Sequence, residues 1–295
     1  MAKSKSFFGL RKGSTKTLTF QVVNGQQVTK DRVSYVKNPR TGAQMDGRCL
    51  MATASAAYSH MRAIVDHSFE GVTYGQKSMS KFIADNYELL KADAAAGNRD
   101  FGYNEYRDRG LKAGKWKISE GTLPEATPDY DITVDDGNIQ LAWAFSGLSA
   151  SSTASDFAAA MGIGVGEMQT ICFMFLAKDG VTWRFGFIRI KCKAVGDVAL
   201  TTSNYEDYFA VESNLGTETA EATTGGFNFN YADANTDDGS DIVKGVINSK
   251  KTAAGWLRST CYMVLTDGMT VEPSFANAVA TFPSGKSYIL NGGKV

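Results

Sequence analysis

Short segments in which apolar and polar residues alternate fill the sequence from about Leu111 onward. Side chains of a strand point to the two faces of a sheet in turn, so this period of two predicts half-buried strands. The expected strands span residues 115–119, 138–145, 168–176, 182–193, 226–231, 242–249 and 255–265. Asp-Gly pairs that begin at positions 136, 179, 238 and 267 fall among them, at intervals typical of a β-sandwich or barrel.

A β-hairpin is predicted near the start of the chain. Residues 16–23 alternate apolar and polar side chains, and residues 27–36 do so again. Asn24-Gly25 lies between the two segments, and this pair suits the positive φ angles of a tight two-residue turn. Asn38-Pro39 then ends the alternating pattern, because the residue before a proline avoids the helical region.

Two helices are predicted after the hairpin. Thr41 and Gln44 form a capping-box pattern, which places a helix start at Thr41. Apolar residues at helical spacing continue to Val65, and the same spacing predicts a second helix over residues 77–95.

These patterns together predict an α+β fold with two domains. Residues 1–112 are expected to form the hairpin and helical region, and residues 113–295 a β-rich domain of sandwich or barrel type. Helices over residues 154–161 and 274–282 are expected to interrupt the strands. The Thr-, Ser-, Gly- and Glu-rich residues 213–225 are expected to form a long exposed loop.

Charge is unevenly distributed, although 31 basic and 31 acidic residues cancel over the whole chain. Residues 1–48 carry ten basic residues against Asp31 and Asp46, whereas residues 194–243 carry ten acidic residues and no Lys or Arg. A chain with a basic and an acidic segment can bind a polyanion, or it can bind copies of itself head to tail. Both segments can equally be solvated faces.

The basic N-terminal segment is the strongest functional indication in the sequence. Its basic residues are interleaved with aromatic ones, a combination suited to phosphate contacts and base stacking. Docking onto an acidic partner and a role in solubility alone are the other interpretations. The residues expected to contact nucleic acid or a partner are Lys3, Lys5, Arg11, Lys12, Lys16, Lys30, Arg32, Lys37 and Arg40.

Motifs for metal ions and cofactors are incomplete, so we expect neither, and no catalytic residues. Asp233, Asn235 and Asp237 alternate as in a calcium loop, but Lys244 holds the position of the bidentate acid, which favours a solvated acidic turn. Residues 162–166 and 285–287 lack the spacing and context of nucleotide-binding loops. His60 and His67, the two histidines, are interpreted as structural.

The cysteines and the apolar segments indicate a soluble, intracellular protein. Cys49, Cys172, Cys192 and Cys261 are widely spaced, and we interpret them as buried free thiols. The basic N-terminus has no apolar segment of signal-peptide length. The longest apolar stretch is much shorter than a membrane helix, so we expect no membrane association.

Two blocks resemble uncharacterised bacteriophage and Bacteroidetes virion-associated proteins. The first is the Asn-Pro-Arg-Thr-x-x-Gln block within residues 37–44, with Arg48, residues 67–72 and Gly75 after it. The second covers residues 245–249 and 255–260. The resemblance implies a viral or phage structural or genome-associated protein with no catalytic residues to transfer, located in the virion or the host cytoplasm. In the second block, Trp256 and Leu257 are expected in the core or an interface, with Arg258 facing outward.

The first functional hypothesis is a non-enzymatic virion structural or assembly protein. It would form a homo-oligomer, contact other virion proteins, and touch nucleic acid or a neighbouring subunit through its basic N-terminal region. The alternative is a protein that binds single-stranded nucleic acid, including single-stranded DNA. A third hypothesis is a hydrolytic enzyme whose site is assembled only in space.

Overall fold

A computed structural model of the chain describes residues 2–4, 13–15, 17–23, 26–32, 42–96, 111, 115–126, 130–135, 137–179, 182–233 and 242–265. These residues belong to two compact units, one within residues 1–41 and the other within residues 42–284. The expected helix over residues 274–282 lies outside the described residues. A boundary near residue 112 stays a prediction, although the helices share a compact unit with the later strands.

The first unit is a four-stranded antiparallel sheet with the order β1-β4-β3-β2. Its strands are β1 (Ala2–Ser4), β2 (Gly13–Ser14), β3 (Leu18–Val23) and β4 (Gln26–Asp31). Val23 lies opposite Gln26, so two residues connect β3 to β4, as the hairpin prediction requires. The second hairpin strand ends at Asp31, and β1 and β2 extend the hairpin into a sheet that the sequence did not predict.

Both predicted helices are present, as α1 (Gly42–Val65) and α2 (Gln76–Ala96), while Thr41 lies outside the described residues. The residues of α2 that are fully or almost fully buried are spaced four apart and form one face of the helix: Ser78, Phe82, Asn86 and Leu90. The Asn86 side chain accepts a hydrogen bond from the Lys117 backbone N–H at 2.8 Å and donates one to the Lys117 carbonyl at 2.9 Å. This pair of bonds fastens α2 to the edge of the large sheet.

The large sheet has the antiparallel order β10-β9-β8-β13-β15-β5, with β14 paired to the end of β13. Its strands are β5 (Trp116–Ser119), β8 (Glu167–Leu176), β9 (Trp183–Cys192), β10 (Phe209–Ser213), β13 (Ile242–Thr252), β14 (Gly255–Arg258) and β15 (Cys261–Leu265). The prediction of one strand over residues 255–265 was wrong. Ser259 interrupts it, because its carbonyl accepts a hydrogen bond from the Ser119 hydroxyl and its backbone N–H donates to the Asn248 carbonyl.

The small sheet has the order β11-β12-β7-β6 and is also antiparallel. Its strands are β6 (Asp131–Asp135), β7 (Asn138–Ala144), β11 (Thr217–Thr223) and β12 (Gly226–Ala232). The loop predicted over residues 213–225 was therefore wrong. An edge strand packs only one face against the core, here with Ala220 opposite Phe229, so it can be rich in Thr and Glu.

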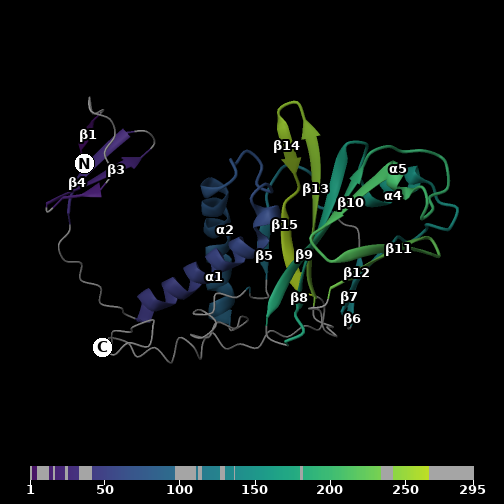
Figure 1. The fold of residues 1–295 in the computed structure, drawn as a ribbon, viewed down its shortest axis with the longest axis horizontal. Helices are drawn as coiled ribbons and strands as arrows, with labels where there is room; N and C mark the ends of the chain where they lie inside the picture. Colours follow the sequence, from purple (N-terminus) through teal and green to yellow (C-terminus); the bar gives the residue numbers. More distant parts are fainter. Residues whose placement is uncertain are drawn as a thin grey trace. The chain divides into compact units, whose positions relative to one another are not determined.

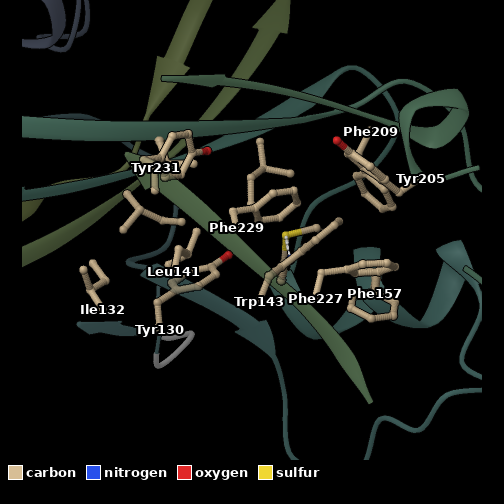
Figure 2. Close-up of a cluster of buried hydrophobic side chains, with 14 of the residues drawn as sticks. Tyr130, Ile132, Leu141, Trp143, Phe157, Tyr205, Phe209, Phe227, Phe229 and Tyr231 are labelled. Atoms are coloured by element: carbon tan, nitrogen blue, oxygen red, sulfur yellow. Dashed lines mark hydrogen bonds between the residues drawn. The ribbon is translucent and has the colours of Figure 1, made fainter. Parts of the chain in front are cut away.

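The two sheets face each other across an aromatic core that also includes α4 (Ala154–Met161) and lies beside α5 (Tyr205–Tyr208). Figure 2 shows Trp143 at its centre, with Phe157, Phe209 and Phe227 within ring-centroid distances of 5.0–5.6 Å. In Figure 1, α1 and α2 lie beside β5 on the other side of the large sheet from the small sheet. The fold is α+β with a β-rich sandwich, as predicted.

Replacing Trp143 with alanine should lower the free energy of unfolding by about 3–5 kcal/mol, because a fully buried indole leaves a cavity among four aromatic rings. Urea denaturation followed by circular dichroism measures this change. Trp256→Ala is the matched control, since Trp256 is 37% exposed. This substitution should lower the free energy of unfolding by less than about 1 kcal/mol. Equal costs for the two variants would contradict this account of the core.

Candidate functional site

The basic N-terminal sheet contains three of the nine residues expected to bind nucleic acid or a partner. Lys3 lies on β1 opposite Val28, Lys30 lies on β4, and Arg32 follows β4 directly. Lys30 and Arg32 are exposed, and Arg32 donates a hydrogen bond to the Thr15 carbonyl at 3.2 Å. The other six, Lys5, Arg11, Lys12, Lys16, Lys37 and Arg40, lie outside the described residues.

The basic N-terminal sheet buries very little of its own surface. Over residues 13–15, 17–23 and 26–32, only Gln27 and Val28 are buried. Leu18, Phe20 and Val22 stay half-buried. A small sheet usually needs a covered apolar face to be stable. These three half-buried side chains are therefore the part of the sheet that another surface would cover.

Exposed acidic residues lie on α5, on the strands β10 and β11, and on the loop before α5. Glu212 of β10 lies on the helix side of the large sheet, where it pairs with Arg189 at 2.9 Å. We call the other four the acidic surface, and they are Asp197, Glu206, Asp207 and Glu221. Asp233 does not belong to it, because Asp233 is buried and pairs with Arg184 at 2.8 Å. The interpretation of a solvated turn is therefore wrong for Asp233, and residues 234–241 lie outside the described residues.

Two cavities of about 410 and 390 Å³ border the segment that follows β5. The first contains Glu167. Burial favours its neutral form, but the Lys250 ammonium at 2.5 Å and the Gly164 N–H together hold the pKa of Glu167 below its usual value. The second contains Cys261, and burial raises the pKa of this thiol to about 12. An ionised carboxylate held in an ion pair and a protonated thiol are poorly suited to acid catalysis and nucleophilic attack.

The remaining sequence motifs have structural positions. Cys172, Cys192 and Cys261 are buried free thiols, as predicted, while the side chain of Cys49 is outside the description. Gly162 ends α4 with a φ of 68° and donates to the carbonyls of its last turn, so its glycine caps a helix. His60 and His67 are exposed, and no group of three or more potential metal ligands lies within the described ranges.

A junction around Glu70 and Arg258 was not predicted from the sequence. The Glu70 carboxylate accepts hydrogen bonds from the Thr122 backbone N–H at 2.9 Å and from the Arg258 backbone N–H at 3.3 Å. The Arg258 side chain donates from Nε to the His67 carbonyl at 3.1 Å. The expectation that Arg258 faces outward was wrong, since it is only 8% exposed. The junction joins the end of α1 to two later segments of the chain.

Comparison with protein-family models, with curated protein sequences and with solved structures found no match for this chain. No helix among the described residues combines the length and the apolar character needed to cross a membrane. Function is therefore argued from the geometry of the chain itself.

Glu70→Gln should destabilise the protein by about 1–2 kcal/mol at pH 7, because a charged acceptor is lost from the junction. Hydrogen bonds, first of all from Thr122, lower the pKa of Glu70. A depressed carboxyl pKa stabilises the fold above the unfolded value and loses this effect as pH falls through the folded value. The cost should therefore shrink at pH 3. Thermal unfolding at both pH values measures it.

Glu88→Gln is the control for this substitution, because Glu88 is exposed on α2 and its nearest cation, Lys91, is 4.0 Å away. It should change stability little at either pH. A Glu70→Gln cost that stays the same at pH 3 and pH 7 would contradict the assignment of the ionised carboxylate to the junction.

Proposed function

We propose that this chain is a non-enzymatic structural or assembly protein of a virus or phage particle. In this proposal the chain self-associates, and its basic N-terminal sheet contacts a neighbouring subunit or nucleic acid. The observation that carries the proposal is the basic sheet itself, a separate compact unit that exposes Lys30 and Arg32. Over residues 13–15, 17–23 and 26–32 it buries only Gln27 and Val28. Such a sheet gains stability from a second surface that covers Leu18, Phe20 and Val22.

The acidic surface is a suitable partner for the basic sheet of another copy. Its members Glu206, Asp207 and Glu221 are exposed, so they can approach a cationic surface without first losing a buried partner. Oppositely charged patches steer two molecules together and fix their orientation, and salt screens the attraction. Head-to-tail association of this kind should therefore weaken as ionic strength rises.

Direct extension of the small sheet through β11 is a less suitable route to assembly. Glu218 lies on this edge strand opposite the buried Tyr231, so its carboxyl points toward the core. Glu218 is half-buried, and this burial raises the pKa of its carboxyl. An inward-pointing acidic residue is one way in which natural edge strands discourage addition of another strand. The proposal thus assigns association to the charged surfaces.

The non-enzymatic part of the proposal rests on the chemistry of the two cavities that border the segment after β5. In the first, Glu167 is held ionised by Lys250; in the second, burial keeps the Cys261 thiol protonated. Glu167 is thus poorly suited to donate a proton near neutral pH, its ion pair with Lys250 competes with any role as a base, and the protonated Cys261 is poorly suited to nucleophilic attack.

A protein that binds single-stranded nucleic acid is the second candidate. The half-buried Phe20 lies on β3, next to the strand that carries Lys30, so an aromatic ring and a cation share one small sheet. Stacking on such rings and phosphate contacts are the usual means of binding single strands. In that case affinity falls steeply with salt, and charge reversal at Arg11, Lys12 and Lys16 abolishes binding.

The double variant Lys30→Glu/Arg32→Glu should weaken self-association about tenfold or more at low salt, because it removes cations from the basic sheet. Sedimentation velocity over a concentration series measures this. Adding Glu221→Lys, which places a cation on the acidic surface, should restore part of the association.

Lys251→Glu is the matched control, since it reverses an exposed lysine at the end of β13. It should leave association unchanged. Unaltered association in the double variant would contradict the subunit contact. Loss of binding to labelled single-stranded DNA with association intact would favour the second candidate.

A further inference from the structure

A third cavity, of about 30 Å³, lies where the end of α1 meets the large sheet. Its walls come from α1 and the residues after it, and from the strands β8, β9, β13 and β14. Two arginines, Arg189 and Arg258, line it together with the buried hydroxyl residues Thr170 and Ser249. Two cations beside one small cavity are energetically unfavourable, because each loses hydration there and they repel each other.

Strand register brings these residues together. Arg258 lies opposite Ser249 in the β13–β14 pair, and Arg189 lies opposite Thr170 in the β8–β9 pair. Ser249 in turn lies opposite Met168, two residues from Thr170 on the same strand. Residues two apart on a strand share a face, so the sheet places both guanidinium groups on its α1 side.

Each arginine has one nitrogen in this region that is buried without a hydrogen-bond partner. These atoms are Nη1 of Arg258 and Nε of Arg189. Another nitrogen of each arginine does have a partner: Arg258 Nε donates to the His67 carbonyl at 3.1 Å, and Arg189 Nη1 donates to Glu212 at 2.9 Å. Arg258 is only 8% exposed. A buried unpaired N–H of a cation is costly, so an acceptor at the cavity would stabilise the fold.

The acidic groups near the cavity do not fully neutralise its two arginines. Glu212 faces Arg189 but is largely exposed, and Glu70 accepts from the backbone of Arg258 and from Thr122. Burial, and then repulsion from Arg189, lowers the pKa of Arg258 to about 10, while Glu70 opposes this change. Arg258 therefore still carries its proton at neutral pH.

We propose that this cavity binds one monatomic anion of the chloride class between Arg189 and Arg258, and that the anion fastens the end of α1 to the large sheet. The volume of about 30 Å³ accommodates one or two water-sized atoms, so a monatomic ion fits it better than a phosphate or a carboxylate ligand. Guanidinium groups only donate hydrogen bonds. A halide, which only accepts them, matches this set of donors and also supplies the opposite charge.

The test compares thermal unfolding of the full chain in sodium chloride, sodium bromide and sodium gluconate at equal ionic strength. The halides should raise the unfolding midpoint saturably, by roughly 3 °C when the site is nearly filled. Arg258→Gln and the more exposed Arg189→Gln should each remove the difference between halide and gluconate. Glu212→Gln should lower the halide concentration at half-effect severalfold, because a competing carboxylate is lost.

Arg184→Gln is the matched control, since Arg184 lies on the same strand as Arg189 but pairs with Asp233. It should retain the full halide effect whatever its own stability. Crystals grown in bromide should show an anomalous peak between the two guanidinium groups. Equal midpoints in all three salts, or a cavity that holds an ordered water only, would overturn the proposal.

Discussion

The strand β8 of the large sheet is buried on both faces over most of its length, and the arrangement of the other elements in its unit depends on this constraint. Seven consecutive residues of β8, from Gln169 to Phe175, are buried. Ile171, Phe173 and Phe175 point into the sandwich core, and the alternate residues point to the side of the helices. A one-residue slip of β8 would exchange these two sets, so packing on both sides fixes the register. The same register brings Arg189 and Arg258 to one cavity.

The sequence predicted the elements whose apolar pattern is strong. The helices α1, α2 and α4 and the strands β7, β8, β9 and β12 appear within a few residues of their expected bounds. The strands β6, β10 and β11 were missed. β6 and β11 are edge strands of the small sheet, and β10 is an edge of the large one. Edge strands are specified by the neighbour that they pair with, which no local pattern reveals.

The candidate surfaces could be predicted only in part. Local composition indicated the basic and acidic segments, and the structure places Lys30, Arg32 and Glu221 at exposed positions. The burial of Arg258 could not be predicted, because it depends on Glu70, which lies 188 residues earlier in the chain. A strand residue of a polar type is expected to face water unless a distant element covers it. Here the segment after α1 provides that cover.

Charge acts at two scales in this account. Within the second unit, ion pairs and carboxylate contacts join distant segments, at a half-buried position for Glu70 and at a buried one for Asp233. On the surfaces, exposed charges of opposite sign are available for contacts between copies. Buried pairs are screened little by salt, whereas exposed ones are screened strongly. Raising the salt concentration should therefore dissociate the oligomer while each copy stays folded.

Light scattering coupled to size-exclusion chromatography, on nuclease-treated full-length protein at low and high salt, tests this account most directly. We expect a discrete oligomer at low salt that dissociates at high salt without unfolding and that forms without added single-stranded DNA. A monomer at every concentration and salt, or an oligomer that appears only with DNA, would contradict association through the charged surfaces.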